Sequence, residues 1–246
     1  MTIGTRRNLT ITGNGGSGGG LYKDVKVVGE AQFNGDMDCL AFRCNGSATV
    51  YGTLKSTSCR INGTLGVNGD FDTGETKING KLDVKGSMKA QEIKSYGETS
   101  VHGNVAGEQV VLEGYFNIKG HCEAEQIKIK GLFRIGGLVN AGTVSLLLHS
   151  RCEVKEIGGE RIDIRRAEGN VLKKLLGSLF LPSDFYEGTL EVDTIEGDDI
   201  YVEHASVRTI RGANVVVGPG CRIGRVEHTG RFENEFGSVV TEREQI

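Results

Sequence analysis

The chain has 246 residues, 38 of them glycine, and its 29 Lys and Arg against 32 Asp and Glu give a formal net charge of −3 at pH 7. This slightly acidic balance excludes a global basic field, so we expect no nucleic-acid partner. The six Cys form no C-x-x-C pair, and no stretch of about 18 apolar residues marks a membrane span. The sequence therefore favours a cytoplasmic protein with reduced thiols and without a metal or other cofactor.

Residues 1–20 are predicted to be a flexible N-terminal tail. Residues 13–20 read GNGGSGGG, a composition typical of linkers. The preceding leader places Arg6 and Arg7 beside Leu9 and Ile11. Two interpretations of this leader stay open: contact with a membrane or partner, or a disordered end or short strand laid on the first coil.

From Val25 to about Thr143, glycines recur every 17 residues in two series, the second six residues behind the first. A fixed period of this size is typical of a solenoid with one coil per repeat. Between the glycines, apolar and polar residues alternate in three short segments per repeat, which predicts strands. The glycines are expected to supply the backbone conformation of the corners. We therefore predict an all-β chain, a parallel β-helix with about 17 residues per coil whose main body spans residues 21–168.

Two outward columns of the predicted coils carry charge. One is a basic ladder, formed by Lys26, Arg43, Arg60, Lys77, Lys94 and Lys128. It is interpreted either as an edge that binds an anionic surface or as a solvated face neutralised by nearby acids. The other column begins Asp38, Lys55, Asp72 and Lys89, and its alternating signs avoid repulsion between stacked neighbours.

The pattern changes after residue 143. A distorted coil is expected around residues 145–159, and residues 169–188 are expected to be a helical insertion. Within it, Asn170–Leu181 has a helical apolar period that ends at Pro182, with the apolar face Leu172, Leu175, Leu176, Leu179 and Phe180. This helix would pack on the solenoid or cover a coil end, or it would bind a membrane surface. Residues 189–230 are expected to form tighter coils of about 15 or 16 residues, and residues 231–246 a C-terminal tail.

No catalytic motif stands out, and the five His are scattered. The best enzymatic alternative is the segment VGPGCRIG (residues 217–224), where Val-Gly and Ile-Gly lie six residues apart, as in hexapeptide acyltransferases. The motif occurs once, and we expect a protein that is not an enzyme.

The triplets on the 17-residue grid resemble those of the bactofilin family of polymer-forming bacterial cytoskeletal proteins. The matching triplets are Ile61-Asn62-Gly63, Val67-Asn68-Gly69, Ile78-Asn79-Gly80, Val84-Lys85-Gly86 and Val101-His102-Gly103. The resemblance implies a right-handed β-helix that assembles into filaments without nucleotide. It also implies a scaffolding role in cell shape, envelope growth or motility. The partners would be other copies of the chain, a paralogous subunit, or membrane and envelope proteins.

A physical argument also favours assembly, because the end coils of a β-helix expose unpaired strand edges and an apolar cross-section. The candidate N-terminal interface residues are Val25, Val27 and Phe33. At the other end the candidates are Val215, Val217, Ile223 and Val226, with Phe232 and Phe236 as further interface or capping residues. A monomeric binding module for an anionic surface or partner is the alternative function.

Overall fold

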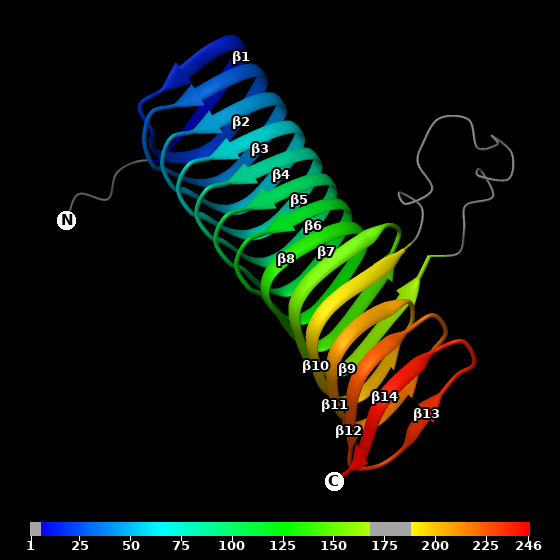
Figure 1. The fold of residues 1–246 in the computed structure, drawn as a ribbon. Helices are drawn as coiled ribbons and strands as arrows, with labels where there is room; N and C mark the ends of the chain where they lie inside the picture. The colour runs from blue at the N-terminus through cyan, green and yellow to red at the C-terminus, as the bar shows by residue number, and fades with distance from the viewer. Residues whose placement is uncertain (1–5, 168–187) are drawn as a thin grey trace, which may run out of the picture. The chain divides into compact units, whose positions relative to one another are not determined.

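The structure is a computed structural model that describes residues 6–167 and 188–246, and these residues form a parallel β-solenoid (Figure 1). They divide into two compact units, Met1–Ala124 and Glu125–Ile246. The first unit holds β1 (Arg7–Ser17), β2 (Gly20–Phe33), β3 (Met37–Val50), β4 (Leu54–Val67), β5 (Phe71–Val84), β6 (Met88–Val101) and β7 (Val105–Ile118). Strand β8 (Cys122–Leu148) begins in the first unit and continues in the second. The second unit also holds β9 (Arg151–Arg166), β10 (Thr189–Val202), β11 (Ala205–Val217), β12 (Arg222–His228), β13 (Phe232–Asn234) and β14 (Val239–Gln245).

The first unit confirms the predicted coil of 17 residues. Met37 pairs with Leu54, and Leu54 pairs with Phe71, so each strand lies beside the strand one repeat further along. Both pairings are parallel, with a lateral spacing of about 4.8 Å between neighbouring strands. The predicted all-β solenoid is therefore the fold of this unit.

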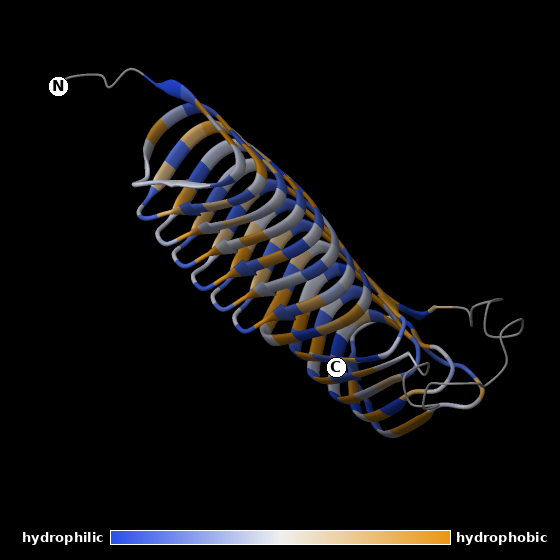
Figure 2. Cartoon of the chain, turned by 90° about the horizontal axis from the view of Figure 1, so that it is seen from above, coloured by the Kyte–Doolittle hydropathy of each residue, from blue (hydrophilic) through white to orange (hydrophobic). Residues whose placement is uncertain are grey.

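Inward side chains fill the interior of each coil, as the alternation predicted. Figure 2 shows hydrophobic and hydrophilic residues alternating along the ribbon of the coils. In the first unit the largest fully buried side chains include Phe33, Phe42, Phe71 and Phe116. The rings of Phe33 and Phe42 meet edge to face with their centroids 5.9 Å apart. No coil can bury its apolar side chains alone, so neighbouring coils stabilise one another.

The strands are longer than the three short segments expected per repeat. Strands β2 to β7 each have 14 residues, and they keep their parallel pairing while they bend around two of the three corners. The remaining corner ends the strands, for example between Phe33 and Met37, and a single unpaired position such as Leu40 marks one of the bent corners. The reason is that the backbone at the bent corners still faces the same residues of the next coil, so the hydrogen-bonded ladder need not break.

The two glycine series serve different purposes. Gly63 has φ +135°, and a Cβ there would clash with the carbonyl oxygen of Gly46 one coil earlier. Gly52 belongs to the other series and has no positive φ, but a Cβ there would clash with the Asp36 carboxylate. The expected role in backbone conformation therefore fits the first series. In the second series, a Cβ would clash with the preceding coil, with the Asp70 carboxylate at Gly86 and with backbone atoms of Gly52 and Thr53 at Gly69.

In the second unit the coil length varies. Leu190 pairs with Ala205, 15 residues on, and Ser206 pairs with Arg222, 16 residues on, which confirms the predicted tighter coils. The register between β8 and β9 shifts where Ile135 pairs with Val154 and Leu138 with Glu156, so on the β9 side the irregular pairing falls within the expected residues 145–159. Residues 145–148 are regular strand within β8.

The structure corrects the expected flexible linker and the expected C-terminal tail, and for the leader it shows one of the open interpretations, a short strand laid on the first coil. Arg7–Ser17 forms β1, which pairs with β2 through ten residue pairs, although its sequence is rich in glycine. Main-chain hydrogen bonds need no side chain, so glycines can complete the ladder. At the other end, β13 and β14 build a last coil on β11 and β12 from residues expected to be a tail. The predicted helix at Asn170–Leu181, with its apolar residues, lies outside the described residues.

Candidate assembly and binding surfaces

The N-terminal end of the first unit is formed by β1. Leu9 pairs with Val25 and Ile11 with Val27, so the two valines lie one coil inside the end. Val25, Val27 and Phe33 are all fully buried. Their predicted exposure at an assembly interface is therefore wrong, because β1 covers them. Leu9 is half-buried and is the apolar side chain that the end coil leaves accessible.

An arginine secures this end coil. The Arg6 guanidinium donates hydrogen bonds to the carbonyl oxygens of Tyr22 and Asp38, at 2.9 and 3.0 Å, and to the Asp38 carboxylate at 2.9 Å. The Tyr22 hydroxyl and the Ser17 hydroxyl are 2.6 Å apart. These contacts fix the path of the chain into β1, so the outer edge of β1 is held in a defined position.

The C-terminal candidates are also mostly inside their unit. Val215, Val217, Ile223 and Val226 are buried, which corrects their predicted place on the end face. They are covered because β13 pairs with Val215–Val217 and β14 pairs with Arg222–His228. The end face is therefore built by the residues of the last two strands.

Phe232 and Phe236 behave differently on that last coil. The Phe232 ring stacks on the His228 ring with centroids 5.5 Å apart, and the Arg243 guanidinium lies 5.3 Å from the centre of the Phe232 ring. Phe232 is half-buried and anchors the last coil, which agrees with its interpretation as a capping residue. Phe236 is fully exposed, so it is not an anchor.

The inward positions of the last coil are mixed, with Phe232 and Val240 apolar and three others polar. Asn234 stands above Val217, Arg243 above Val226 and Gln245 above His228. Arg225 of the preceding coil forms ion pairs with Glu242 and Glu244. Charged side chains at an edge strand discourage indiscriminate pairing. The C-terminal end is therefore more polar than the N-terminal end, where Leu9 and Ile11 stand at inward positions.

The basic ladder exists as a stacked column. Lys26, Arg43, Arg60, Lys77 and Lys94 follow one another in register on the first unit, whereas Lys128 belongs to the second unit. Arg43 lies 3.7 Å from Asp24, and Lys94 pairs with Glu92. Lys77 lies over the Tyr96 ring. Among the described residues, Lys26 and Arg60 have no ion-pair or hydrogen-bond partner for their side chains. The interpretation as a face neutralised by nearby acids is thus true of Arg43 and Lys94 only.

An amide ladder beside the basic column was not anticipated. The Asn62 side chain donates a hydrogen bond to the Asn45 side-chain oxygen at 2.9 Å, and Asn79 donates to Asn62 at 2.9 Å. The signal in the sequence was Asn at the same position of three successive repeats. These bonds link exposed side chains along the axis of the coils and so stiffen this face.

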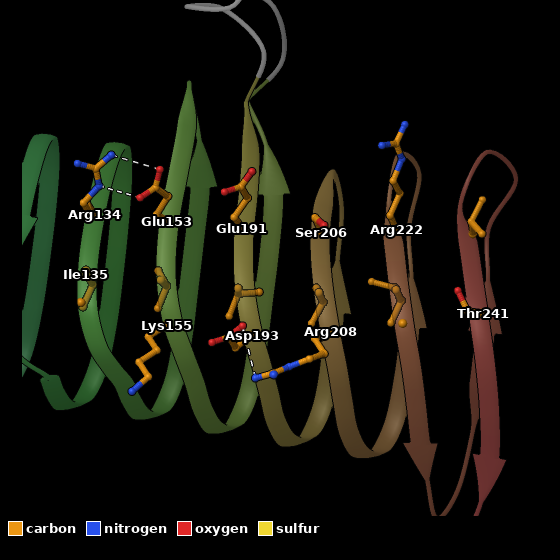
Figure 3. Close-up of a pocket in the computed structure, with 17 residues that line it drawn as sticks. Arg134, Ile135, Glu153, Lys155, Glu191, Asp193, Ser206, Arg208, Arg222 and Thr241 are labelled. Carbon is orange, nitrogen blue, oxygen red and sulfur yellow. Dashed lines mark hydrogen bonds and ion pairs between the residues drawn. The ribbon is translucent and has the colours of Figure 1, made fainter.

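The second unit carries an open groove of about 810 Å³ across successive strands (Figure 3). Its rim has both signs of charge. Arg134 pairs with Glu153 at 2.8 Å, and Arg208 lies 3.5 Å from Asp193. Because most of these charges pair with one another, the groove is a mixed polar surface with no dominant sign.

The thiols and imidazoles of the chain are not gathered into a reactive centre. All six Cys are free and buried, and burial raises the pKa of Cys39 and of Cys122 to about 12. His228 is buried against Phe232. Across residues 6–167 and 188–246, no group of three or more His, Cys, Asp or Glu is placed to hold a metal ion.

These observations define a parallel β-solenoid protein with accessible strand edges at the ends of its coils. No family model matches the chain, and no solved structure matches it. It is 33% identical over 110 residues to the uncharacterized protein YhbF of Bacillus subtilis (strain 168). The match covers 44% of this chain and 42% of YhbF, so it spans less than half of that relative. In the described part of the chain, no helix is long and apolar enough to cross a membrane.

Proposed function

We propose that the protein is a non-enzymatic cytoskeletal scaffold that assembles end to end into filaments without nucleotide, the role that its resemblance to bactofilins implies. It would act in the cytoplasm in cell shape, envelope growth or motility. Its partners would be further copies of the chain or a paralogous subunit, with membrane or envelope proteins as attachment points. The observation that carries the proposal is the accessible edge of β1.

Strand β1 has a paired neighbour on one side only within the described residues, and so has β14. The other side of each strand presents backbone N–H and C=O groups without strand partners. Such an edge is a template for pairing with another chain. The edge of β1 carries a single charged residue, Arg7, and therefore lacks the charges that would discourage pairing.

The two ends also match in position within the coil. Leu9 pairs with Val25, and the 17-residue grid carries the Val25 column to Val144. Within the second unit, strand pairing carries this column through Ile162, Ile200 and Val215 to Phe232. A second copy that continued the coils would thus place its Leu9 on Phe232, apolar on apolar. A heterologous contact of this kind repeats without closing and generates a filament.

The test uses two substitutions on β1. Leu9→Glu places a charge on the apolar edge, whereas Thr10→Glu adds the same charge to an exposed side chain of the same strand. We expect wild-type and T10E protein to form filaments in negative-stain electron microscopy and to sediment without nucleotide. L9E protein should keep its β-sheet circular dichroism and stay in the supernatant. Uniform small particles of the wild-type protein would contradict the proposal, as would L9E filaments.

A binding module for an anionic surface is the second candidate, and the unpaired Lys26 and Arg60 of the basic ladder favour it. It predicts salt-sensitive binding to vesicles that contain anionic lipid, lost in a K26E/R60E variant. A K85E variant, which carries one such charge reversal on another face, should bind as wild type. Equal binding of all three proteins would exclude the ladder as the contact.

A further inference from the structure

One outward column of the first unit carries charges in strict alternation. Asp38, Lys55, Asp72 and Lys89 stand in register on four successive coils, β3 to β6. Lys55, Asp72 and Lys89 are exposed, and Asp38 is half-exposed beside Arg6. Since successive strands lie about 4.8 Å apart, the four charges form a short straight row of fixed spacing.

The charges of this row do not neutralise one another. Among the described residues, the side chains of Lys55, Asp72 and Lys89 form neither ion pairs nor hydrogen bonds. The same fold pairs charges of adjacent coils elsewhere, since Lys81 and Glu98 lie 2.8 Å apart on another face. Lys55, Asp72 and Lys89 are therefore presented to solvent with their charges free to meet a partner, whereas Asp38 already pairs with Arg6.

We propose that two copies of the chain pair face to face through this row, with their coils antiparallel. A two-fold axis between the coils of Lys55 and Asp72 places Lys55 of each copy opposite Asp72 of the other. It also places Asp38 of each copy opposite Lys89 of the other. A row in the order acid, base, acid, base is complementary to itself when read in reverse, which is what an isologous contact requires.

The alternating charges favour this register over the two registers in which the two-fold axis passes through Lys55 or through Asp72. An axis through Lys55 would set Lys55 against Lys55 and Asp38 against Asp72, and an axis through Asp72 would likewise oppose like charges. Like charges brought together at an interface disfavour these two registers. In the favoured register, the column two residues along sets Thr57 of one copy opposite Gly74 of the other and the exposed Leu40 opposite Gln91.

This contact uses a flat face of the coils and not their ends, so it goes beyond the proposed end-to-end assembly. It would join single filaments side by side, or join two monomers where no filament forms. Every residue that the contact requires lies in the first unit.

The test combines charge reversals in full-length protein that carries L9E, so that the readout does not depend on end-to-end assembly. We expect the L9E parent to sediment as a dimer at low ionic strength and as a monomer in 1 M NaCl. K55D or D72K should each weaken dimerisation by about tenfold or more, because each opposes like charges at two symmetric positions. An equimolar mixture of the K55D and D72K proteins should dimerise, since each chain then faces opposite charge.

The double variant K55D/D72K separates this pairing from a role within one chain. It restores opposite charges across the two-fold axis but breaks the alternation within the row, so only intermolecular pairing predicts that it dimerises. The control is K26D, which makes the same charge change on another face and should dimerise like the parent. A parent that is monomeric at low salt, dimeric single variants, or a monomeric mixture would each overturn the proposal.

Discussion

The Asp36 carboxylate accepts a hydrogen bond of 2.7 Å from the backbone N–H of Thr53, one coil further along. The same contact recurs along this corner with different side chains. Asp70 accepts from the N–H of Ser87 at 2.8 Å, and Asn104 accepts from the N–H of His121 at 3.0 Å. A short polar side chain at this corner thus satisfies a backbone donor where the strand ladder is interrupted.

Replacing Asp70 by Ala should lower the free energy of unfolding by about 1 kcal/mol, because the N–H of Ser87 loses its protein acceptor. Urea unfolding followed by circular dichroism would measure the change. Asn68→Ala is the control, since Asn68 is exposed and its side chain has no hydrogen bond among the described residues. An equal effect of the two substitutions would show that the corner bond contributes nothing.

Gly63→Ala should destabilise the protein by about 3 kcal/mol or more. Its φ of +135° strains any residue with a Cβ, and the new methyl would clash with the backbone of Gly46. Gly66→Ala should be nearly neutral, since the atom nearest to its added Cβ is the Thr49 Oγ1, 3.8 Å away. Thermal unfolding of the two variants checks the difference. Similar melting temperatures would contradict this account of the glycine grid.

Phe232→Ala should loosen the last coil without unfolding the rest. The substitution removes the stacking on His228 of β12 and the contact with Arg243 of β14, which hold β13 against these two strands. Hydrogen exchange should then quicken at residues 232–235 and remain slow in β10. Phe236→Ala, at a fully exposed position, should leave the exchange pattern unchanged. Exchange that stays slow in the F232A protein would show that the ring does not anchor the coil.

Alkaline pH should destabilise the fold through its buried thiols. Burial raises the pKa of Cys44 from 9.0 to about 11, so between these values the thiol stays protonated in the folded chain and ionises in the unfolded chain. The unfolded state then binds fewer protons, and stability falls with rising pH by about 1.4 kcal/mol per unit for each such thiol. Its contribution is complete below pH 9 and is lost progressively above it.

Unfolding by urea at pH 7, 8, 9 and 10 tests this prediction with Cys44→Ala. The variant should lose stability less steeply than wild type above pH 9, because one of the six buried thiols is gone. The difference between the two proteins should be constant from pH 7 to 8, where the thiol is protonated in both states. Parallel curves up to pH 10 would contradict the assignment.

The sequence by itself determined the coil. The glycine spacing and the alternation of apolar and polar residues predicted a parallel solenoid of 17-residue coils. The first unit confirms it, for example where Ile61 pairs with Ile78 one coil further along. These signals are local and repeated, so each repeat supports the interpretation of the next. The stacking of the basic ladder followed from the same period, although which of its charges are paired did not.

Only the tertiary structure decided where the coils end. Residues 13–17 look like a linker, yet they complete a strand because pairing with β2 uses backbone groups that glycine also has. Asn234, Arg243 and Gln245 break the apolar alternation, yet they stand at inward positions of the last coil. An end coil has a neighbour on one side only, so its inward positions need not be apolar. For this reason the end strands lack the apolar alternation on which the sequence prediction relied. The candidate interface residue at the N-terminal end is therefore Leu9, because β1 covers Val25.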